Sequence, residues 1–352
     1  MNNSLYLHIP FCHSICPYCD FCRQVYDEKT VDKYLNVLLT TIPEEDFNTI
    51  YLGGGTPSCL TIEQTTKLLE KLYNRTSGEY TIECNVEDIN EEKLVLYKEY
   101  GINRMSLGVQ SFDNEILEIC KRSYSSEDAI SATNLVSQYF DNYSIDLLYG
   151  FTYQSEKSFE NDLAIAIKMN VPHISLYALT LNENSVWGRM RMIIVDEEKI
   201  VDFYELAHKK LAAKYEHYEI SNFALNGHQA IHNLVYWNYK DFYGLGLGAS
   251  GKKGNNRYSY TRVMTDYLEK QVLIEDITLS KDEEMFEYLM MNFRLSRGID
   301  LSEFKELFSA DFMDYYSEAI EKNNDCFAVS DNSIAIKKEY WLISNNILSE
   351  FL

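Results

Sequence analysis

The stretch Cys12-His-Ser-Ile-Cys16-Pro-Tyr-Cys19-Asp-Phe-Cys22 holds four of the eight cysteines of this chain. Its first three cysteines have the spacing C-x3-C-x2-C and follow an apolar run at residues 5–9, which predicts that they lie on the first loop after a strand. Three thiolates on one loop can ligate three irons of a cubane iron–sulfur cluster, and the fourth iron then stays open to a chelating small molecule. The alternatives are a zinc site, which normally takes four ligands, and a group of buried, unreactive cysteines.

Composition and charge restrict the location and the partners of the chain. Its 352 residues are 46% apolar, which suggests about two domains with a sizeable core. No run approaches the ~20 apolar residues of a membrane span, and the N-terminus lacks a signal peptide, so we expect a cytoplasmic protein. In that compartment clustered thiols act as metal ligands or catalytic groups. The net charge of −22 repels phosphate backbones and argues against a nucleic-acid partner, while peripheral contact with a membrane is left open.

Short apolar runs alternate with helical patterns over the first two-thirds of the chain. The predicted strands are residues 5–9, 49–52, 80–84, 104–109, 144–148 and 173–178, and the predicted helices are residues 61–72, 91–100, 127–139, 156–169 and 197–214. Strands that alternate with helices predict a parallel sheet with right-handed crossovers. We therefore expect an α/β fold with a partial (β/α)6 barrel, whose chemistry lies at the carboxyl ends of the strands.

The pattern changes after about residue 225, so we expect a core domain over residues 1–225 and a mostly helical domain over residues 226–352. Glycines crowd residues 244–256 at the start of the second part. Helices are predicted from a capping box at Ser280-Lys-Asp-Glu283 onward, at residues 302–308 and 311–322, and near the C-terminus. Residues 327–336 contain a Ser-Asp-Asn-Ser turn and are a candidate hairpin.

A glycine-rich motif, Tyr51-Leu-Gly53-Gly54-Gly55-Thr56-Pro57, follows the second predicted strand. Consecutive glycines leave the backbone bare, so that a ligand can approach its N–H and C=O groups closely. A tight strand-to-helix turn is the simpler explanation. Because this motif comes one strand after the cysteine loop, the two are neighbours in a barrel. Together they predict a metal cluster beside a cradle for a polar ligand.

These motifs resemble those of the radical S-adenosylmethionine (SAM) proteins, and in particular the HemN/HemW group, which contains oxygen-independent coproporphyrinogen III oxidases and haem chaperones. The resemblance runs nearly end to end. It rests on Tyr6-Leu-His-Ile-Pro-Phe-Cys12, Cys16-Pro-Tyr-Cys-Asp-Phe21, Gly53-Gly-Gly-Thr-Pro57, Leu107-Gly-Val-Gln-Ser-Phe112, Ile145-Asp-Leu-Leu148, Ile174-Ser-Leu-Tyr177, Tyr218-Glu-Ile-Ser-Asn-Phe-Ala224, His232-Asn-Leu-Val-Tyr-Trp237 and Asn292-Phe-Arg-Leu295.

The resemblance implies that Cys12, Cys16 and Cys19 bind a [4Fe-4S] cluster and that SAM chelates its fourth iron. It implies SAM contacts from Tyr6, Tyr18, Gly54, Gly55, Thr56, Glu83, Gln110, Arg122, Asp146 and Ala178. Carboxylates suit the ammonium group and ribose hydroxyls of SAM, and the planar fork of an arginine suits its carboxylate. A reduced cluster would then deliver an electron that cleaves SAM into methionine and a 5′-deoxyadenosyl radical.

Some positions depart from the pattern of the group. After the third strand the group often has Glu-Ala-Asn-Pro, where this chain has Glu83-Cys-Asn-Val86. After the fourth strand it often has Arg-x-His, where this chain has Arg122-Ser-Tyr124. The arginine is kept, so SAM binding is still expected. The histidine is absent, which removes one candidate proton carrier or ligand.

Two features favour the haem chaperones of the HemW type over the oxidases. In the oxidases a long extension precedes the cluster, and a fourth cysteine follows the third as C-x-C. Here eleven residues precede Cys12, and Phe21 occupies the position of that fourth cysteine. We therefore expect no coproporphyrinogen oxidase activity and no ligand role for Cys22, whereas turnover of SAM is left open.

The resemblance also implies haem as cargo, haem-accepting proteins as partners and an electron donor for the cluster. His232, Tyr236 and Trp237 belong to the segment associated with haem contact, since imidazole is a common axial ligand and the two aromatic rings offer flat apolar surface. A packed, hydrogen-bonded histidine is the simpler explanation of His232. The alternative function is a radical SAM oxidoreductase acting on a tetrapyrrole, either a coproporphyrinogen oxidase or a haem-degrading enzyme, and a homodimer is left open.

Overall fold

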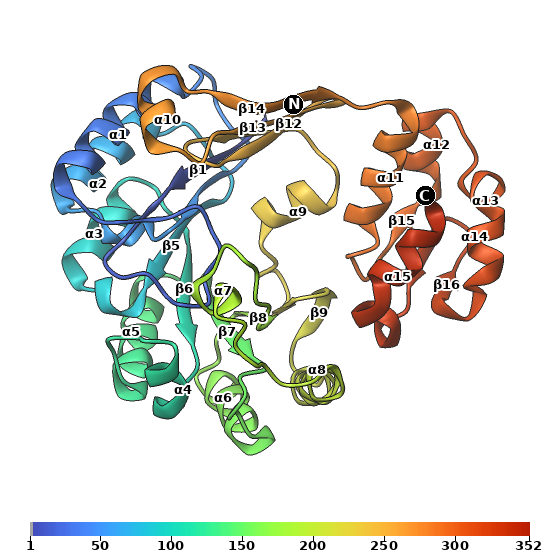
Figure 1. The fold of residues 1–352 in the computed structure, drawn as a ribbon, viewed down its shortest axis with the longest axis horizontal. Coiled ribbons are helices and arrows are strands. Elements are labelled where there is room, and N and C mark those ends of the chain that lie inside the picture. Colours follow the sequence, from blue (N-terminus) through green and yellow to red (C-terminus); the bar gives the residue numbers. More distant parts are fainter. Residues whose placement is uncertain (1–2) are drawn as a thin grey trace.

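A curved sheet of parallel strands forms the centre of the protein (Figure 1). The computed structural model describes residues 3–352. The parallel strands stand side by side in the order of the sequence: β1 (Ser4–Ile9), β4 (Ile50–Gly54), β5 (Tyr80–Asn85), β6 (Arg104–Gln110), β7 (Tyr143–Tyr149) and β8 (His173–Ala178). All six were predicted, because each is a short apolar run between turn and helix signals.

The helices that connect these strands cover the outer face of the sheet (Figure 1). They are α1 (Glu28–Thr41), α2 (Ile62–Leu72), α3 (Glu91–Glu99), α4 (Asn114–Ile119), α5 (Ser126–Tyr139), α6 (Glu156–Lys168) and α8 (Glu197–Leu211). The predicted capping box of α2 is confirmed, since the Thr61 hydroxyl and the Gln64 side chain each accept a hydrogen bond from the other's backbone N–H. α1 and α4 were not predicted.

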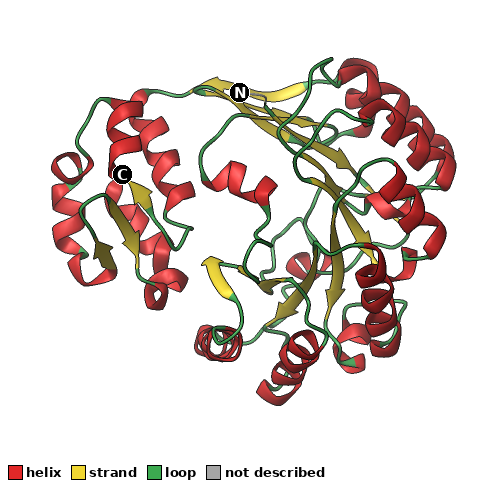
Figure 2. Ribbon diagram, turned by 180° about the vertical axis from the view of Figure 1, so that it is seen from behind, coloured by secondary structure: helices red, strands yellow, loops and turns green. Residues whose placement is uncertain are grey.

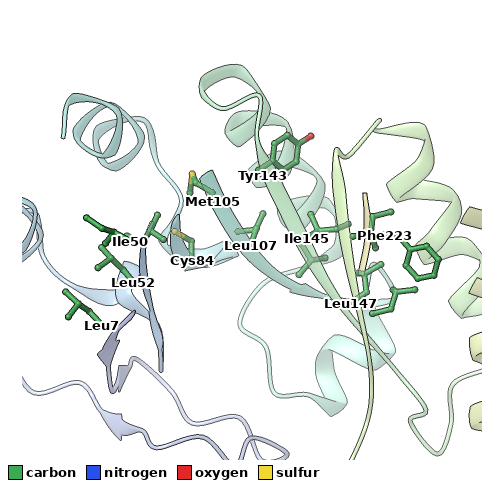
Figure 3. Close-up of a cluster of buried hydrophobic side chains, with 14 of the residues drawn as sticks. Leu7, Ile50, Leu52, Cys84, Met105, Leu107, Tyr143, Ile145, Leu147 and Phe223 are labelled. Atoms are coloured by element: carbon green, nitrogen blue, oxygen red, sulfur yellow. The ribbon is translucent and has the colours of Figure 1, made fainter. Parts of the chain in front are cut away.

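Buried side chains of alternate strand residues fill the space between the sheet and its helices. Leu52, Leu107, Ile145 and Leu147 are at most 1% exposed and lie in this layer (Figure 3). Because strand side chains alternate between two faces, the residues between these point to the concave face. The packing of the outer face therefore leaves the inner face free for polar side chains.

The sheet does not close into a barrel over residues 3–352. On one side β1 pairs with β11 (Phe242–Leu245) in parallel, and on the other side β8 pairs with β10 (Asn222–Ala224), which continues into β9 (Glu216–Glu219). The expected partial barrel is therefore confirmed. Figures 1 and 2 both place the short helix α9 (Ile231–Trp237) between the two ends of the curved sheet.

The glycine-rich segment after residue 240 folds as sheet, which the sequence did not predict. β11, β12 (Ser250–Lys253), β13 (Asn256–Tyr260) and β14 (Leu273–Thr278) extend the sheet from β1, and α10 (Met264–Lys270) lies between the last two. Gly246, Gly248 and Gly254 have φ values of +115°, +72° and +57°, so these glycines make the turns between the strands. The boundary at residue 225 stays a prediction, and the sheet continues on both sides of it.

The C-terminal part is mainly helical, as expected (Figure 2). It contains α11 (Lys281–Asn292), α12 (Leu301–Phe308), α13 (Phe312–Tyr315), α14 (Ser317–Lys322) and α15 (Ser344–Leu348), with a small sheet of β15 (Ile299–Asp300), β16 (Phe327–Val329) and β17 (Ser333–Ile336). The predicted hairpin is confirmed as β16–β17, whereas the helix predicted over residues 311–322 is broken at Tyr316, which leaves the helical conformation. None of the helices described over residues 3–352 has the length and apolarity needed to cross a bilayer.

Candidate functional site

The cysteine loop leaves the carboxyl end of β1 and is fixed at both of its ends. Its first residues, β2 (Phe11–Cys12), pair with β3 (Gln24–Val25) after the loop. Within the loop, the N–H of Cys19 donates to the carbonyl of Cys16 over 3.2 Å, and the Pro17 carbonyl accepts from Trp187 N–H over 2.9 Å. This frame holds the loop against the segment that follows β8.

Cys12, Cys16 and Cys19 all line one cavity of about 380 Å³, which we call the thiol pocket. Cys12 is 8% exposed, and burial raises the pKa of its thiol to about 11, so it carries a proton unless a cation is bound. No three His, Cys, Asp or Glu side chains among residues 3–352 converge on a single metal ion. In a cubane cluster each cysteine ligates a different iron, so thiols spread along one loop fit that group.

The thiol pocket brings together residues from the ends of successive strands. Every predicted cluster and SAM residue except Tyr6 lines it, namely Cys12, Cys16, Tyr18, Cys19, Gly54, Gly55, Thr56, Glu83, Gln110, Arg122, Asp146 and Ala178. These residues come from separate loops and strands of the first 180 residues. The geometry therefore fits a ligand that contacts the cysteine loop and the strand ends at once.

Gly54, the last residue of β4, and Gly55, the next residue, have no room for a side chain. Gly54 has φ +120°, and a Cβ on it would lie 2.7 Å from Nδ1 of His8. A Cβ on Gly55 would lie 2.9 Å from the backbone nitrogen and oxygen of Phe11. Any side chain at these positions would displace β1 or the start of the cysteine loop. The glycine-rich motif therefore does more than form a turn, because it also lets β1 and the cysteine loop pack closely against this backbone.

Glu83 at the end of β5 faces these glycines. Its carboxylate accepts from the Tyr51 hydroxyl over 2.7 Å and from the backbone N–H of Gly54 over 3.0 Å. Burial raises the pKa of Glu83 to about 7, and the hydrogen bond from Tyr51 opposes this rise. A cationic ligand beside Glu83 would therefore favour its charged form, which suits the ammonium group of an amino acid.

Arg122 provides the complementary charge. Its guanidinium donates to the hydroxyl of Tyr18 over 2.9 Å and to the side-chain oxygen of Asn85 over 3.2 Å, both neutral groups. Asn85 in turn donates to Thr56, and the Thr56 hydroxyl lies 3.5 Å from the sulfur of Cys12. One chain of polar contacts thus joins Arg122 to the cysteine loop, and the arginine is available to a carboxylate in the pocket.

Asp146 and Gln110 complete the polar wall. The Asp146 carboxylate accepts from the Ser106 hydroxyl over 3.1 Å, and burial raises the pKa of this aspartate. Gln110 has φ +68°, a left-handed conformation that a non-glycine residue adopts at a cost, and it ends β6 at the pocket. Both residues were predicted, and both lie where hydroxyl and amide groups of a ligand can reach them.

Several further residues that line the thiol pocket were not among the predicted site residues. They are Tyr51, Asn85, Arg104, Ser106, Ser144, Ser175, Tyr177 and Asn233. Strand alternation could have found some of them, because Arg104 and Ser106 share a face of β6 with Gln110. Arg104 is 2% exposed, and its nearest acidic partner, Glu79, lies 3.8 Å from its Nε.

Tyr6 lies outside the thiol pocket. Its hydroxyl is 2.9 Å from Nδ1 of His8, and both residues line a neighbouring cavity of about 360 Å³ that shares Gly54 and Glu83 with the thiol pocket. Cys22 also lines this neighbouring cavity, and its carbonyl pairs with Nε2 of His8 over 2.7 Å. A SAM contact of Tyr6 stays a prediction.

His232 is fully buried at the start of α9. One ring nitrogen is 2.6 Å from the Thr49 hydroxyl and the other is 2.7 Å from the Tyr236 hydroxyl. Burial lowers the pKa of His232 to about 3, so the ring is neutral. An iron at either nitrogen would have to displace one of these two hydroxyls, and haem ligation by His232 stays a prediction.

Tyr236 and Trp237, in contrast, line an open cavity of about 560 Å³ between α9, the β12–β13 hairpin and α11, which we call the aromatic groove. It shares Tyr6 and Ser250 with the cavity around Cys22. The three cavities therefore lie in a row from the cysteine loop to the C-terminal part, and each shares lining residues with the next. Tyr236 and Trp237, two of the three residues predicted for haem contact, line the aromatic groove, which is the last cavity of the row.

Comparison with known proteins identifies two family domains and full-length relatives. Residues 6–166 match the Radical SAM superfamily, and residues 279–333 match the HemN C-terminal domain. A protein of Lactococcus lactis named heme chaperone HemW is 33% identical over 99% of this chain and 97% of its own length. Proteins of the same name from Bacillus subtilis (30% identical, 99% of each chain) and Escherichia coli (34% identical, 86% of this chain and 85% of that one) also match.

The fold has a solved counterpart. The structure of coproporphyrinogen III oxidase (HemN) from Escherichia coli, a radical SAM enzyme, matches with a TM-score of 0.85 over 99% of this chain and 90% of that one, at 21% identity. At that identity the likeness shows the fold alone. The full-length similarity to the HemW proteins is closer, and with the C-x3-C-x2-C loop and the glycine cradle on one pocket it shows that this chain belongs to the HemW family of the radical SAM superfamily.

Proposed function

We propose that this protein is a haem chaperone of the HemW type, which binds a [4Fe-4S] cluster and SAM in the thiol pocket and passes haem to acceptor proteins. The observation that carries the proposal is the convergence of Cys12, Cys16 and Cys19 with the polar strand-end residues on one pocket, in a chain similar over its whole length to proteins named heme chaperones. Haem, haem-accepting proteins and an electron donor are the partners that follow.

Three sets of residues in the thiol pocket would have different roles. Cys12, Cys16 and Cys19 would each ligate one iron, and their thiols would lose their protons on binding. Gly54 and Gly55 would admit the methionine part of SAM, with Glu83 beside its ammonium group and Arg122 beside its carboxylate. Tyr18, Thr56, Gln110, Asp146 and Ala178 would line the rest of the ligand. When bound, the cluster and SAM together supply one-electron chemistry.

The second candidate function is a radical SAM oxidoreductase acting on a tetrapyrrole. Coproporphyrinogen III oxidase of Escherichia coli has the same fold, so the fold is compatible with this function as well as with the first. The two functions differ in what happens to the tetrapyrrole: a chaperone returns haem unchanged to an acceptor, whereas an oxidoreductase changes it.

One experiment separates the two functions. The protein with its cluster reconstituted is incubated anaerobically with dithionite, SAM and either coproporphyrinogen III or haem, and the tetrapyrroles are analysed by chromatography. A second sample is loaded with haem and mixed with an apo-haemoprotein, whose absorbance reports transfer. We expect transfer of intact haem and no new tetrapyrrole. Formation of protoporphyrinogen or a haem breakdown product would replace the chaperone proposal with the oxidoreductase.

A further inference from the structure

The aromatic groove has the size and the walls of a site for a flat apolar ligand. Tyr236, Trp237, Phe242 and Tyr258 line it together with Ile277. Its volume of about 560 Å³ lies within the range of ordinary cofactor sites, which are mostly apolar and often lie where two parts of a protein meet. Here the meeting parts are the extended sheet, α9 and α11.

One ring in the groove is held rigidly. The guanidinium of Arg294 stacks on Trp237, 4.4 Å from the ring centroid, and Arg294 does not line the groove itself. The guanidinium thus covers one face of the indole, and Trp237 lines the cavity. A ring that is held by its neighbours offers a stacking surface at little entropic cost.

Three cationic side chains lie among the aromatic walls of the groove. Lys240, Lys252 and Arg257 line it, and each has an acidic partner: Lys252 pairs with Asp241 and Arg257 with Glu287. Lys240 is mainly exposed and reaches Glu303 over 2.7 Å. Because an exposed ion pair is weak, Lys240 is the cation of the groove that a carboxylate of a ligand recruits most easily.

The groove also offers one uncommitted donor atom to a metal. The hydroxyls of Tyr6, Tyr236 and Tyr258 are each engaged, with His8, His232 and the N–H of Gly244 respectively. The thioether of Met291, on α11, makes no hydrogen bond to any residue of the described chain and lines the cavity. Methionine sulfur is an established axial ligand of haem iron.

We infer that the aromatic groove holds the haem, stacked against Trp237, with Met291 as an axial ligand of the iron and with Lys240 at a propionate. The inference rests on the proposed function, since it takes haem as the cargo. It assigns the iron to a different side chain from His232, whose two ring nitrogens are engaged by the hydroxyls of Thr49 and Tyr236. It also places the cargo in the last cavity of the row that begins at the cysteine loop.

The test uses the full-length protein and four variants, Met291→Leu, Met290→Leu, Lys240→Gln and His232→Ala. Haem is titrated into wild type, Met291→Leu and Met290→Leu, and the affinity and the ferric and ferrous spectra are recorded. Leucine keeps the volume of methionine but removes the sulfur, and Met290 is a neighbour on α11 that does not line the groove. We expect Met291→Leu to change the spectra and to weaken binding roughly 10-fold, as the loss of a metal-supporting group does, with no change in Met290→Leu. Lys240→Gln should weaken binding of haem but not of haem dimethyl ester, which lacks the propionate charges.

The outcomes distinguish the inference from the proposed function. If the wild type binds haem and Met291→Leu matches Met290→Leu in spectrum and affinity, the inference is wrong and the chaperone proposal stands. The same holds if His232→Ala, and not Met291→Leu, changes the iron spectrum. If the wild type does not bind haem at all, the proposed function itself fails, and the inference fails with it.

Discussion

The thiol pocket and the aromatic groove are built in opposite ways. The thiol pocket joins short motifs at the ends of neighbouring parallel strands, and its walls are thiols, carboxylates, amides and an arginine. The aromatic groove joins α9, β11–β13, β14 and α11, and its walls are rings and aliphatic side chains with a few cations. The first suits small polar groups that need directed contacts, and the second suits a large flat ligand.

This difference suggests a division of labour. Directed contacts fix one ligand in one orientation, as a pocket for SAM and a cluster requires. A partly open, mainly apolar groove binds through surface burial, which is less directional and so better suited to a cargo that must leave again. If the division is real, damage to one site leaves binding at the other intact.

The strongest test of the division removes the cluster. Cys16→Ser should abolish iron and sulfide incorporation, because one iron loses its thiolate and a hydroxyl is a poor replacement. Iron, sulfide and visible absorbance are measured after anaerobic reconstitution. Haem affinity of the same variant should equal that of the wild type. A loss of haem binding in this variant would show that the two sites are one functional unit.

Cys22→Ser is the matched control, since Cys22 lies on the same loop but lines the neighbouring cavity. It should keep the iron and sulfide content of the wild type. Reduced iron in this variant would make Cys22 a ligand and overturn its assignment as a bystander.

The next largest effect is expected at Gly54, in the glycine-rich motif that lines the thiol pocket. Gly54→Ala should remove measurable SAM binding and lower the free energy of unfolding by about 2–3 kcal/mol, because it combines a left-handed conformation with a clash against His8. Gly101→Ala is the control: its φ is +86°, but a Cβ there meets nothing within 4 Å, so only about 1 kcal/mol of conformational strain is expected. Calorimetry with SAM and thermal unfolding give both quantities. Equal destabilisation of the two variants would mean that strain alone, and not the close packing of the cradle, makes Gly54 necessary.

The two sites also differed in how far the sequence could predict them. The six parallel strands and the residues at their ends are encoded locally, so the motifs around Cys12, Gly54 and Glu83 located the thiol pocket in advance. Strands β11–β14 could not be predicted, because their glycines indicate a loop and only pairing with β1 makes them sheet. The aromatic groove depends on this non-local pairing. Met291, Tyr258 and Lys252 therefore carried no signal that would group them.

A smaller effect is expected at Arg122. Arg122→Gln should weaken SAM binding about 10–100-fold, the cost of losing a charged hydrogen-bonding partner, while the cluster and haem affinity stay unchanged. The reason is that Arg122 donates only to the neutral groups of Tyr18 and Asn85 and is left to pair with a carboxylate. Methionine methyl ester should compete for SAM binding less well than methionine in the wild type, and equally well in the variant. An unchanged preference for methionine in Arg122→Gln would assign the carboxylate to another residue.

The smallest effect is a pH dependence confined to the thiol pocket. Burial raises the pKa of Glu83 to about 7 in the folded protein, above its ordinary value of 4.5, so the folded state holds this proton more tightly. The stability that Glu83 contributes is therefore full below about pH 4.5 and is lost as the pH rises through about 7.

A bound ammonium group reverses this preference for the protonated form, because it favours the charged carboxylate of Glu83. Affinity for SAM should thus rise with pH up to about 7 in the wild type, by at most about tenfold per pH unit. Glu83→Gln should show a flat profile. Haem affinity should follow the same pH profile in both proteins, since Glu83 does not line the aromatic groove. Parallel SAM profiles in the two proteins would place the titrating group elsewhere.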